Sequence, residues 1–282
     1  METLTDGNSK KEMVKEKYAQ IALQDRSENA SSCCGAGGCS TDAYTIFNED
    51  YTGLKGYNPD ADLALGCGIP VKYAGIKEGD TVVDLGSGAG NDVFVARSLV
   101  GDDGRVIGID MTEVMIEKAR KNNEKLGYSN VEFRLGDIEK MPVGPNRADV
   151  VLSNCVLNLV PDKEKAFSEI QRILKPGGHF CISDIVMSGV LPEKIQNAAE
   201  MYAGCISGAM QKNDYLTVIH NAGFQNVSIR TEKEIQVPDD ILLDYLSADE
   251  LKNLKDSGVK IESITVTAEK AKSECCSSSG CC

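Results

Sequence analysis

The stretch that most constrains the fold is residues 82–91, where an apolar segment leads directly into three alternating glycines, in the sequence VVDLGSGAGN. Glycine lets the backbone turn tightly and brings its N–H groups close to a ligand at the start of a helix. About one strand-helix-strand unit later, Asp110 ends the next apolar segment, where an acidic residue can bind a ribose diol. The pattern predicts a nucleoside site at the edge of an α/β sheet.

The spacing of the glycines separates two kinds of cofactor. In a dinucleotide-binding G-x-G-x-x-G motif, the third glycine would fall at Asn91. The D-x-G-x-G-x-G form found here instead resembles that of S-adenosylmethionine-dependent methyltransferases. This resemblance implies that S-adenosyl-L-methionine is the cosubstrate.

Strands and helices alternate regularly after residue 81. Strands that are apolar throughout, such as residues 149–152, are typical of a parallel sheet buried on both faces. We therefore expect an α/β fold with a doubly wound, mostly parallel, seven-stranded sheet of the Rossmann-like class I methyltransferase type. The expected strands lie near 81–85, 105–110, 131–135, 148–153 and 179–186, and the expected helices near 91–99, 112–126 and 162–174.

The chain is predicted to have four parts. Residues 1–50 form an N-terminal arm with an exposed amphipathic helix at 10–25 and a flexible, Cys-rich segment. Residues 51–188 form the S-adenosylmethionine-binding domain, 189–271 form a C-terminal α+β region that covers the substrate, and 272–282 form a Cys-rich tail. Further expected elements are a helix start near 58–60, helices at 192–210 and 213–222, a strand at 224–231, two short helices within 239–256 and a strand at 261–267.

Polar residues follow several of the expected strands, at the sheet edge where ligands bind in open parallel sheets. Asp84 and the glycine loop would hold the methionine moiety, and Asp110 would bind the ribose hydroxyls. Asp137 would accept a hydrogen bond from the adenine amine; alternatively, Asp110 and Asp137 are only helix caps. Met111 and Ile138 would sandwich the adenine. The candidate cofactor-binding residues are Asp84, Gly86, Ser87, Gly88, Asn91, Asp110, Met111, Asp137, Ile138, Glu139 and Asn154.

Charge and termini narrow the range of partners. The net charge of −13, without a cluster of Lys and Arg, argues against nucleic acid or an anionic membrane as the partner. No apolar run approaches the length of a membrane helix, about 18 residues. The polar, acidic N-terminus does not resemble a secretory signal, so we expect a cytoplasmic protein with reduced thiols and a small substrate.

The eleven cysteines are the second unusual feature. His179 and His220 do not lie at promising strand ends, so an acceptor that needs no strong general base fits best. Cys67 lies between two glycines, which would let a ligand approach its sulfur. Cys155 follows an expected strand, and Cys205 lies among small residues.

Three thiols from three substrate-facing segments would suit a soft acceptor, although each could be a small buried apolar residue. Structural zinc usually takes four ligands, and these cysteines have no nearby histidine. Trivalent arsenic takes three sulfurs and keeps a lone pair, which could attack a sulfonium methyl group. No structural metal is expected.

Several segments resemble microbial arsenite S-adenosylmethionine methyltransferases: GCGIP at 66–70, LSNCV at 152–156, GCISGA at 204–209 and VKIESITV at 259–266. The resemblance extends from about residue 15 to 270 and implies that Cys67, Cys155 and Cys205 bind As(III). It also implies a further N-terminal cysteine, which could be Cys33, Cys34 or Cys39. The implied substrates are arsenite and its thiol conjugates. A thioredoxin or a glutathione/glutaredoxin-type reductant would restore the thiols after methylation.

Two other functions stay open on the sequence alone. One is a methyltransferase for a small organic acceptor, and the other is a non-catalytic, thiol-rich metalloid-binding protein. The tail cysteines at 275–282 could scavenge metalloid or have no role. Alternatively, they could form a zinc clip with the N-terminal cluster through the Cys34-x4-Cys39 and Cys276-x4-Cys281 spacings.

Overall fold

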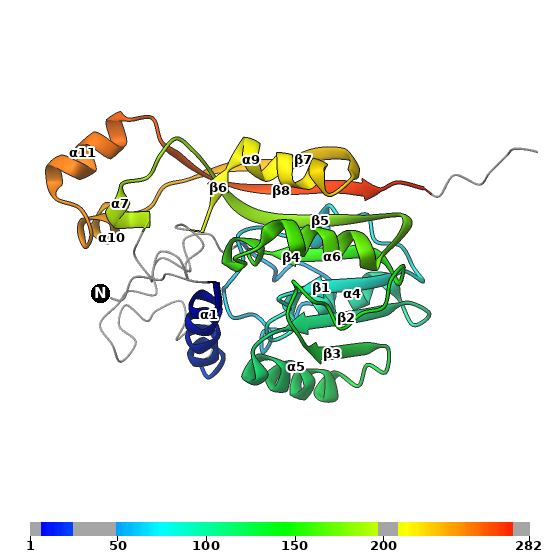
Figure 1. The fold of residues 1–282 in the computed structure, drawn as a ribbon. Coiled ribbons are helices and arrows are strands. Elements are labelled where there is room, and N and C mark those ends of the chain that lie inside the picture. The colour runs from blue at the N-terminus through cyan, green and yellow to red at the C-terminus, as the bar shows by residue number, and fades with distance from the viewer. Residues whose placement is uncertain (1–6, 25–48, 197–207, 273–282) are drawn as a thin grey trace, which may run out of the picture.

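The computed structural model describes residues 7–24, 49–196 and 208–272. In these ranges, seven strands form one sheet in the order β3-β2-β1-β4-β5-β8-β7, which confirms the expected mostly parallel sheet (Figure 1). The antiparallel strand is β8, which pairs with β5 and β7. The short strand β6 adds an eighth strand beside β5, which the sequence did not predict. The strands are β1 (Thr81–Leu85), β2 (Arg105–Asp110), β3 (Val131–Leu135), β4 (Ala148–Asn154), β5 (Leu174–Ser188), β6 (Met210–Gln211), β7 (Phe224–Ile235) and β8 (Lys260–Lys270).

The helices begin and end where local capping favours it. The Asp162 side chain accepts a hydrogen bond from the Lys165 N–H at the start of α6, and Gly127 ends α5 with a φ of 70°. A capping box of Ser247 and Glu250 opens α11. The described helices are α1 (Gly7–Ala22), α4 (Asn91–Val100), α5 (Glu113–Leu126), α6 (Lys163–Ile173), α7 (Glu193–Gln196), α9 (Lys212–Asn221), α10 (Asp239–Leu243) and α11 (Ala248–Asp256), with 3-10 turns η1 (Pro70–Lys72) and η2 (Leu157–Leu159).

Both faces of the sheet are buried. Val82 and Val83 are both fully buried, and they belong to separate apolar clusters, because successive strand residues point to opposite faces. Val150 and Val151 on β4 repeat this arrangement. The continuously apolar strands therefore form the centre of a doubly wound fold, as predicted.

The N-terminal helix differs from the expected exposed helix at 10–25. It spans Gly7–Ala22, and Val14, Ile21 and Ala22 are buried. The Lys118 ammonium donates to the carbonyl oxygens of Ala22 and Gln24, each at 2.9 Å, which fastens the end of α1 to α5. The apolar side chains of α1 thus pack against the rest of the structure, and α1 lies beside α5 (Figure 1).

Two other expectations are wrong in detail. The residues near 58–60 form a turn in place of a helix start. Of the helix expected at 192–210, α7 occupies only Glu193–Gln196, residues 197–207 lie outside the described ranges, and Met210 belongs to strand β6. The later elements, from α9 to β8, agree with the sequence-based prediction.

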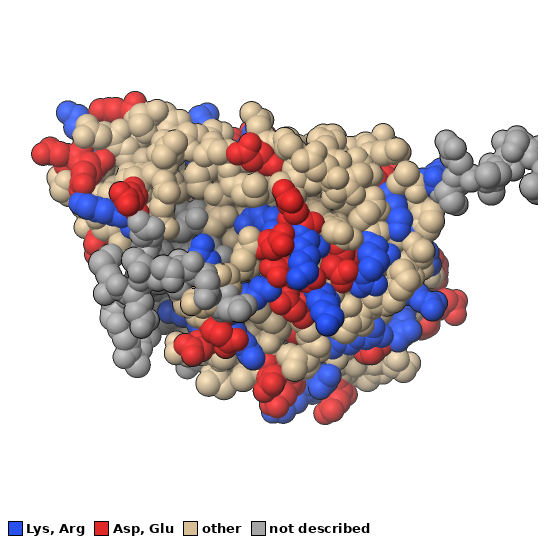
Figure 2. Space-filling model, viewed as in Figure 1, with Lys and Arg blue, Asp and Glu red and all other residues tan. Residues whose placement is uncertain are grey.

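The surface in Figure 2 carries basic and acidic side chains interspersed with one another. None of the helices within the described residues is both long and apolar enough to cross a membrane.

Candidate active site

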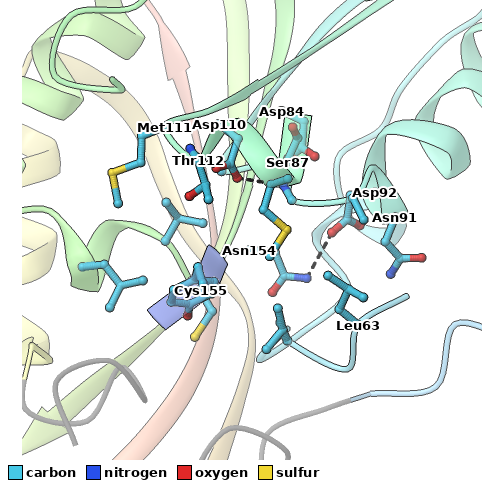
Figure 3. A pocket seen from close by; sticks show the side chains of 18 of the residues that line it. Leu63, Asp84, Ser87, Asn91, Asp92, Asp110, Met111, Thr112, Asn154 and Cys155 are labelled. Atoms are coloured by element: carbon cyan, nitrogen blue, oxygen red, sulfur yellow. Dashed lines mark hydrogen bonds between the residues drawn. The ribbon is translucent and has the colours of Figure 1, made fainter. Parts of the chain in front are cut away.

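One pocket brings together the ends of β1, β2 and β4, the loop after β3, the segment before η1, and helix α1. Figure 3 shows acidic side chains along one part of its wall and Cys155 at another. Most of the candidate cofactor-binding residues therefore lie together. Those that line the pocket are Asp84, Gly86, Ser87, Gly88, Asn91, Asp110, Met111, Asp137, Ile138 and Asn154.

The glycine loop forms a tight cradle whose inner surface is open. Gly86 has a φ of +65°, and a Cβ there would lie 2.4 Å from a Val156 methyl carbon. Gly88 has a φ of +51°, and a Cβ there would meet only the Met115 sulfur, at 4.0 Å. Gly86 therefore permits close packing, whereas Gly88 leaves room for a ligand beside the backbone.

Two buried side-chain oxygens at the glycine loop lack a hydrogen bond among the described residues. Among the described residues, the buried Ser87 Oγ and Asn91 Oδ1 have no hydrogen-bond partner. Both residues line the pocket, beside the start of α4. Buried polar atoms are normally satisfied, so these two oxygens are exceptions, and they belong to the residues that surround the glycine loop.

Asp110 is fixed from two sides. Its carboxylate accepts hydrogen bonds from the Gly88 N–H at 3.0 Å and the Thr112 N–H at 2.8 Å. Burial raises its pKa, although these backbone hydrogen bonds lower it. Asp110 thus holds the glycine loop and also presents a carboxylate to the pocket, which suits a ribose diol.

Two more buried carboxylates, Asp84 and Asp92, line the pocket. Burial raises the pKa of Asp84 well above its ordinary value, and the nearby Asp92 and Asp110 carboxylates raise it further. Burial also raises the pKa of Asp92 to about 6, although hydrogen bonds from Asn154 and Tyr51 lower it. Burial thus disfavours the charged form of both carboxyl groups, and a cationic ligand beside them would stabilise that charged form.

Asp137 and Glu139, at the loop after β3, both bind Lys11 of helix α1. The Lys11 Nζ lies 2.6 Å from Asp137 Oδ2 and 2.6 Å from Glu139 Oε2. Burial lowers the pKa of Lys11, but the hydrogen bonds with both carboxylates outweigh this effect and leave the pKa raised. Lys11 and Asp137 line the pocket, whereas Glu139, which was also predicted to bind the cofactor, does not. Asp137 is thus shared between α1 and any ligand in the pocket.

Asn154 connects the pocket to the loop that carries Cys67. The Cys67 N–H donates to Asn154 Oδ1 at 3.1 Å, and Asn154 Nδ2 donates to the Gly68 carbonyl at 2.9 Å. Because Cys155 directly follows Asn154 in the chain, this amide holds the two thiol-bearing segments side by side. Cys67 and Cys155 also belong to one apolar cluster with residues of α10 and α11.

The glycines that flank Cys67 serve a purpose different from the expected one. A Cβ at Gly66 would lie 2.8 Å from Asn154 Nδ2, and a Cβ at Gly68 would lie 2.6 Å from Ser183 Oγ. They therefore let the loop approach the end of β4 and the neighbouring part of β5. Cys67 itself is only 2 % exposed and Cys155 only 8 %, so the glycines do not open a path to the Cys67 sulfur.

Cys155 has an unusual backbone, with a φ of 60°. Left-handed conformations are strained for residues other than glycine and cluster at functional sites. Its N–H donates to the Ser183 carbonyl at 2.8 Å, which fixes the turn after β4. The remaining predicted thiols, Cys205, Cys33, Cys34 and Cys39, lie outside the described residues, as do the tail cysteines of the suggested zinc clip.

Sequence reasoning missed several residues that line this pocket, among them Lys11, Tyr51 and Asp92. Asp92 gave a usable signal, because it is an acidic residue directly after the glycine loop, in the first turn of α4. Lys11 and Tyr51 reach the pocket from distant parts of the chain, without any local motif.

Comparisons with known proteins agree with this geometry. Residues 76–223 match the family described as "Methyltransferase domain". An arsenite methyltransferase of Halobacterium salinarum is 41% identical over 245 residues, covering 81% of this chain. One of Aquipseudomonas alcaligenes is 30% identical over 243 residues, covering 83% of this chain.

A solved structure is also similar. The crystal structure of an arsenic(III) S-adenosylmethionine methyltransferase from Chlamydomonas reinhardtii is 36% identical, with a TM-score of 0.62, and the match covers 73% of this chain and 68% of that one. The chain spans 61% of the length of the Halobacterium protein and 68% of the Aquipseudomonas protein. With its methyltransferase domain and this similarity, the chain belongs to the arsenite methyltransferase family.

Proposed function

We propose that this protein transfers methyl groups from S-adenosyl-L-methionine to thiolate-bound trivalent arsenic in the cytoplasm, giving methyl- and dimethylarsenicals. The observation that carries the proposal is the hydrogen bond from the Cys67 N–H to the Asn154 amide, which lies directly before Cys155 at the wall of a carboxylate-lined pocket. In this proposal, residues 51–188 bind the donor and 189–271 cover the substrate.

In this proposal, separate groups of residues bind the donor and the arsenic. Asp110 would bind the ribose, and Met111 and Ile138 would enclose the adenine from two sides. Asp84 and Asp92 would offset the donor's positive charge, while the donor supplies an activated methyl group on its sulfonium. Cys67, Cys155 and Cys205 would hold arsenic with its lone pair directed at the methyl carbon of the donor. Fixing this direction of attack would be the main catalytic contribution of the protein.

Each methylation formally oxidises arsenic from As(III) to As(V). Two cysteine thiols that form a disulfide release the two electrons needed to return arsenic to As(III). Cys33, Cys34 and Cys39 are the candidates for this exchange. A thioredoxin or a glutathione/glutaredoxin-type reductant would then reduce the disulfide.

Product analysis tests the proposal. Purified full-length protein is incubated with arsenite, S-adenosylmethionine and a thiol reductant, and arsenic species are resolved by mass. We expect methylated arsenic in step with S-adenosylhomocysteine. Donor turnover only with an added quinone-like or sterol-like acceptor would favour the organic-acceptor alternative. Arsenite binding without any S-adenosylhomocysteine would favour the metalloid-binding one.

Asp110→Ala should weaken donor binding about 10- to 100-fold, because hydrogen bonds to a charged group contribute about 1.5–3 kcal/mol. The variant also frees the Gly88 N–H that Asp110 holds. Calorimetric titration with S-adenosylhomocysteine measures the effect. Asp103→Ala, at an exposed turn position, is the matched control and should bind normally. Equal affinities in the two variants would argue against the ribose assignment.

Donor affinity should also fall in acid. S-adenosylmethionine carries a net positive charge, and the Asp92 carboxylate attracts it only when ionised. Because the pKa of Asp92 is raised to about 6, the contribution of Asp92 to donor affinity should be constant above that pH and fall up to about tenfold for each pH unit below it. Titrations between pH 5 and 8 without arsenite measure this. In Asp92→Asn the dependence should flatten and affinity should stay low throughout. An unaltered pH profile in the variant would assign the titration to another group.

A further inference from the structure

The Asn154 amide is surrounded so that it can face only one way. Its Nδ2 lies 2.9 Å from the Gly68 carbonyl, 2.9 Å from Tyr51 Oη and 3.1 Å from Asp92 Oδ2, while its Oδ1 accepts from the Cys67 N–H. A flipped amide would set oxygen against a carboxylate and a carbonyl, and nitrogen against an N–H. Asp92 and Gly68 therefore fix the acceptor that holds Cys67.

The Tyr51 hydroxyl contacts the same groups as the Asn154 amide nitrogen. Its hydroxyl lies 2.9 Å and 3.1 Å from the two Asp92 oxygens and 3.1 Å from the Gly68 carbonyl. The Tyr51 side chain is buried. Burial raises its pKa well above the ordinary value, and the Asp92 carboxylate adds to this shift. The phenol thus stays protonated and able to donate.

The same residues form part of the pocket wall. Tyr51, Asp92 and Asn154 all line the pocket, and so does Gly66, directly before Cys67. Figure 3 shows Asn154 between Asp92 and Cys155, with the hydrogen bond to Asp92 drawn. A ligand that contacts Asp92 therefore acts on a group that is one hydrogen bond from Asn154 and two from the Cys67 backbone.

We propose that Tyr51, Asp92 and Asn154 are one positioning unit, through which donor binding and As(III) binding at the Cys67 loop strengthen each other. This inference rests on the proposed function. An ionic ligand beside Asp92 holds that carboxylate in place, which fixes the Asn154 amide and hence the Cys67 backbone. Linkage requires the effect to be reciprocal, so arsenic on the thiols must tighten the donor site by the same factor.

The test is a thermodynamic cycle on the reduced full-length protein. The dissociation constant of S-adenosylhomocysteine, which cannot donate a methyl group, is measured with and without saturating arsenite. Wild type should bind it about 5- to 150-fold more tightly with arsenite, the usual range of coupling between sites. Tyr51→Phe should reduce this ratio about fivefold, the value of one hydrogen bond. Tyr73→Phe, at a residue 42 % exposed and outside the pocket lining, should keep the wild-type ratio.

Asn154→Ala supplies a second variant and should bring the ratio close to one. A purely structural role would weaken both separate affinities or lower the unfolding temperature while leaving the ratio unchanged, and that outcome would overturn the inference. Arsenite and S-adenosylhomocysteine that both bind wild type with a ratio of one would overturn it as well, without touching the proposed function. Failure of wild type to bind arsenite at all would instead reject the proposed function, and this inference with it.

Discussion

Cys155→Ser is expected to lose arsenite methylation to the background level and to lose tight As(III) binding. Serine keeps the size of the side chain but replaces a soft sulfur ligand with a hard oxygen, which trivalent arsenic binds far less well. Even a misplacement of the reacting groups by about 1 Å can lower a reaction rate about 100-fold. In this variant an arsenic ligand is removed altogether. Methylation rates and arsenite affinity, measured on the purified variant, check this expectation. Cys205→Ser should behave in the same way.

Cys181→Ser is the matched control. Cys181 is buried on β5, and its thiol donates to the Pro70 carbonyl at 3.1 Å, a bond that a serine hydroxyl can replace. Burial raises the pKa of this thiol to about 12, so it stays protonated and is a poor metalloid ligand. This variant should methylate arsenite almost normally. Methylation at the wild-type rate by Cys155→Ser would show that Cys155 is not an arsenic ligand.

Gly86→Ala should destabilise the fold and disrupt the donor site. A side chain at a φ of +65° costs about 1–2 kcal/mol. The new methyl group would also overlap the Val156 side chain, at 2.4 Å, and overpacking costs about 1–3 kcal/mol more. The free energy of unfolding in urea should fall by about 2–5 kcal/mol in total. Donor affinity should fall as well, because the glycine loop must shift away from Val156, in the turn after β4.

Gly127→Ala separates the two contributions. Gly127 has a φ of +70°, but a Cβ there meets nothing within 4 Å. This variant should lose only the conformational part, about 1–2 kcal/mol, and keep its donor affinity. Equal losses in the two variants would mean that contact with Val156 contributes little.

The sequence predicted the sheet and the glycine loop well because both depend on local patterns. The apolar run at 81–85 has to be buried on both faces, and Gly86 and Gly88 mark the turn that follows β1. Asp110 was predictable because it ends the next strand, where the carboxyl ends of parallel strands meet.

Other parts of the site depend on contacts between residues that are distant in the sequence, and no local pattern predicts such contacts. Lys11 binds carboxylates 126 and 128 residues away, and Asn154 Nδ2 meets a tyrosine 103 residues earlier. The glycines beside Cys67 suggested an open approach to its sulfur, but they permit packing against Asn154 and Ser183. The two-residue strand β6 was missed because its pairing with β5 requires knowledge of the sheet.

X-ray absorption at the arsenic edge tests whether Cys67, Cys155 and Cys205 bind As(III), and it is measured on reduced protein loaded with one equivalent of arsenite and S-adenosylhomocysteine. Wild type should show three sulfur neighbours around arsenic, and Cys67→Ser, Cys155→Ser and Cys205→Ser should each show the loss of one sulfur. An arsenic shell that is rich in oxygen in wild type, or a three-sulfur shell unchanged in all three variants, would contradict the assignment of these thiols.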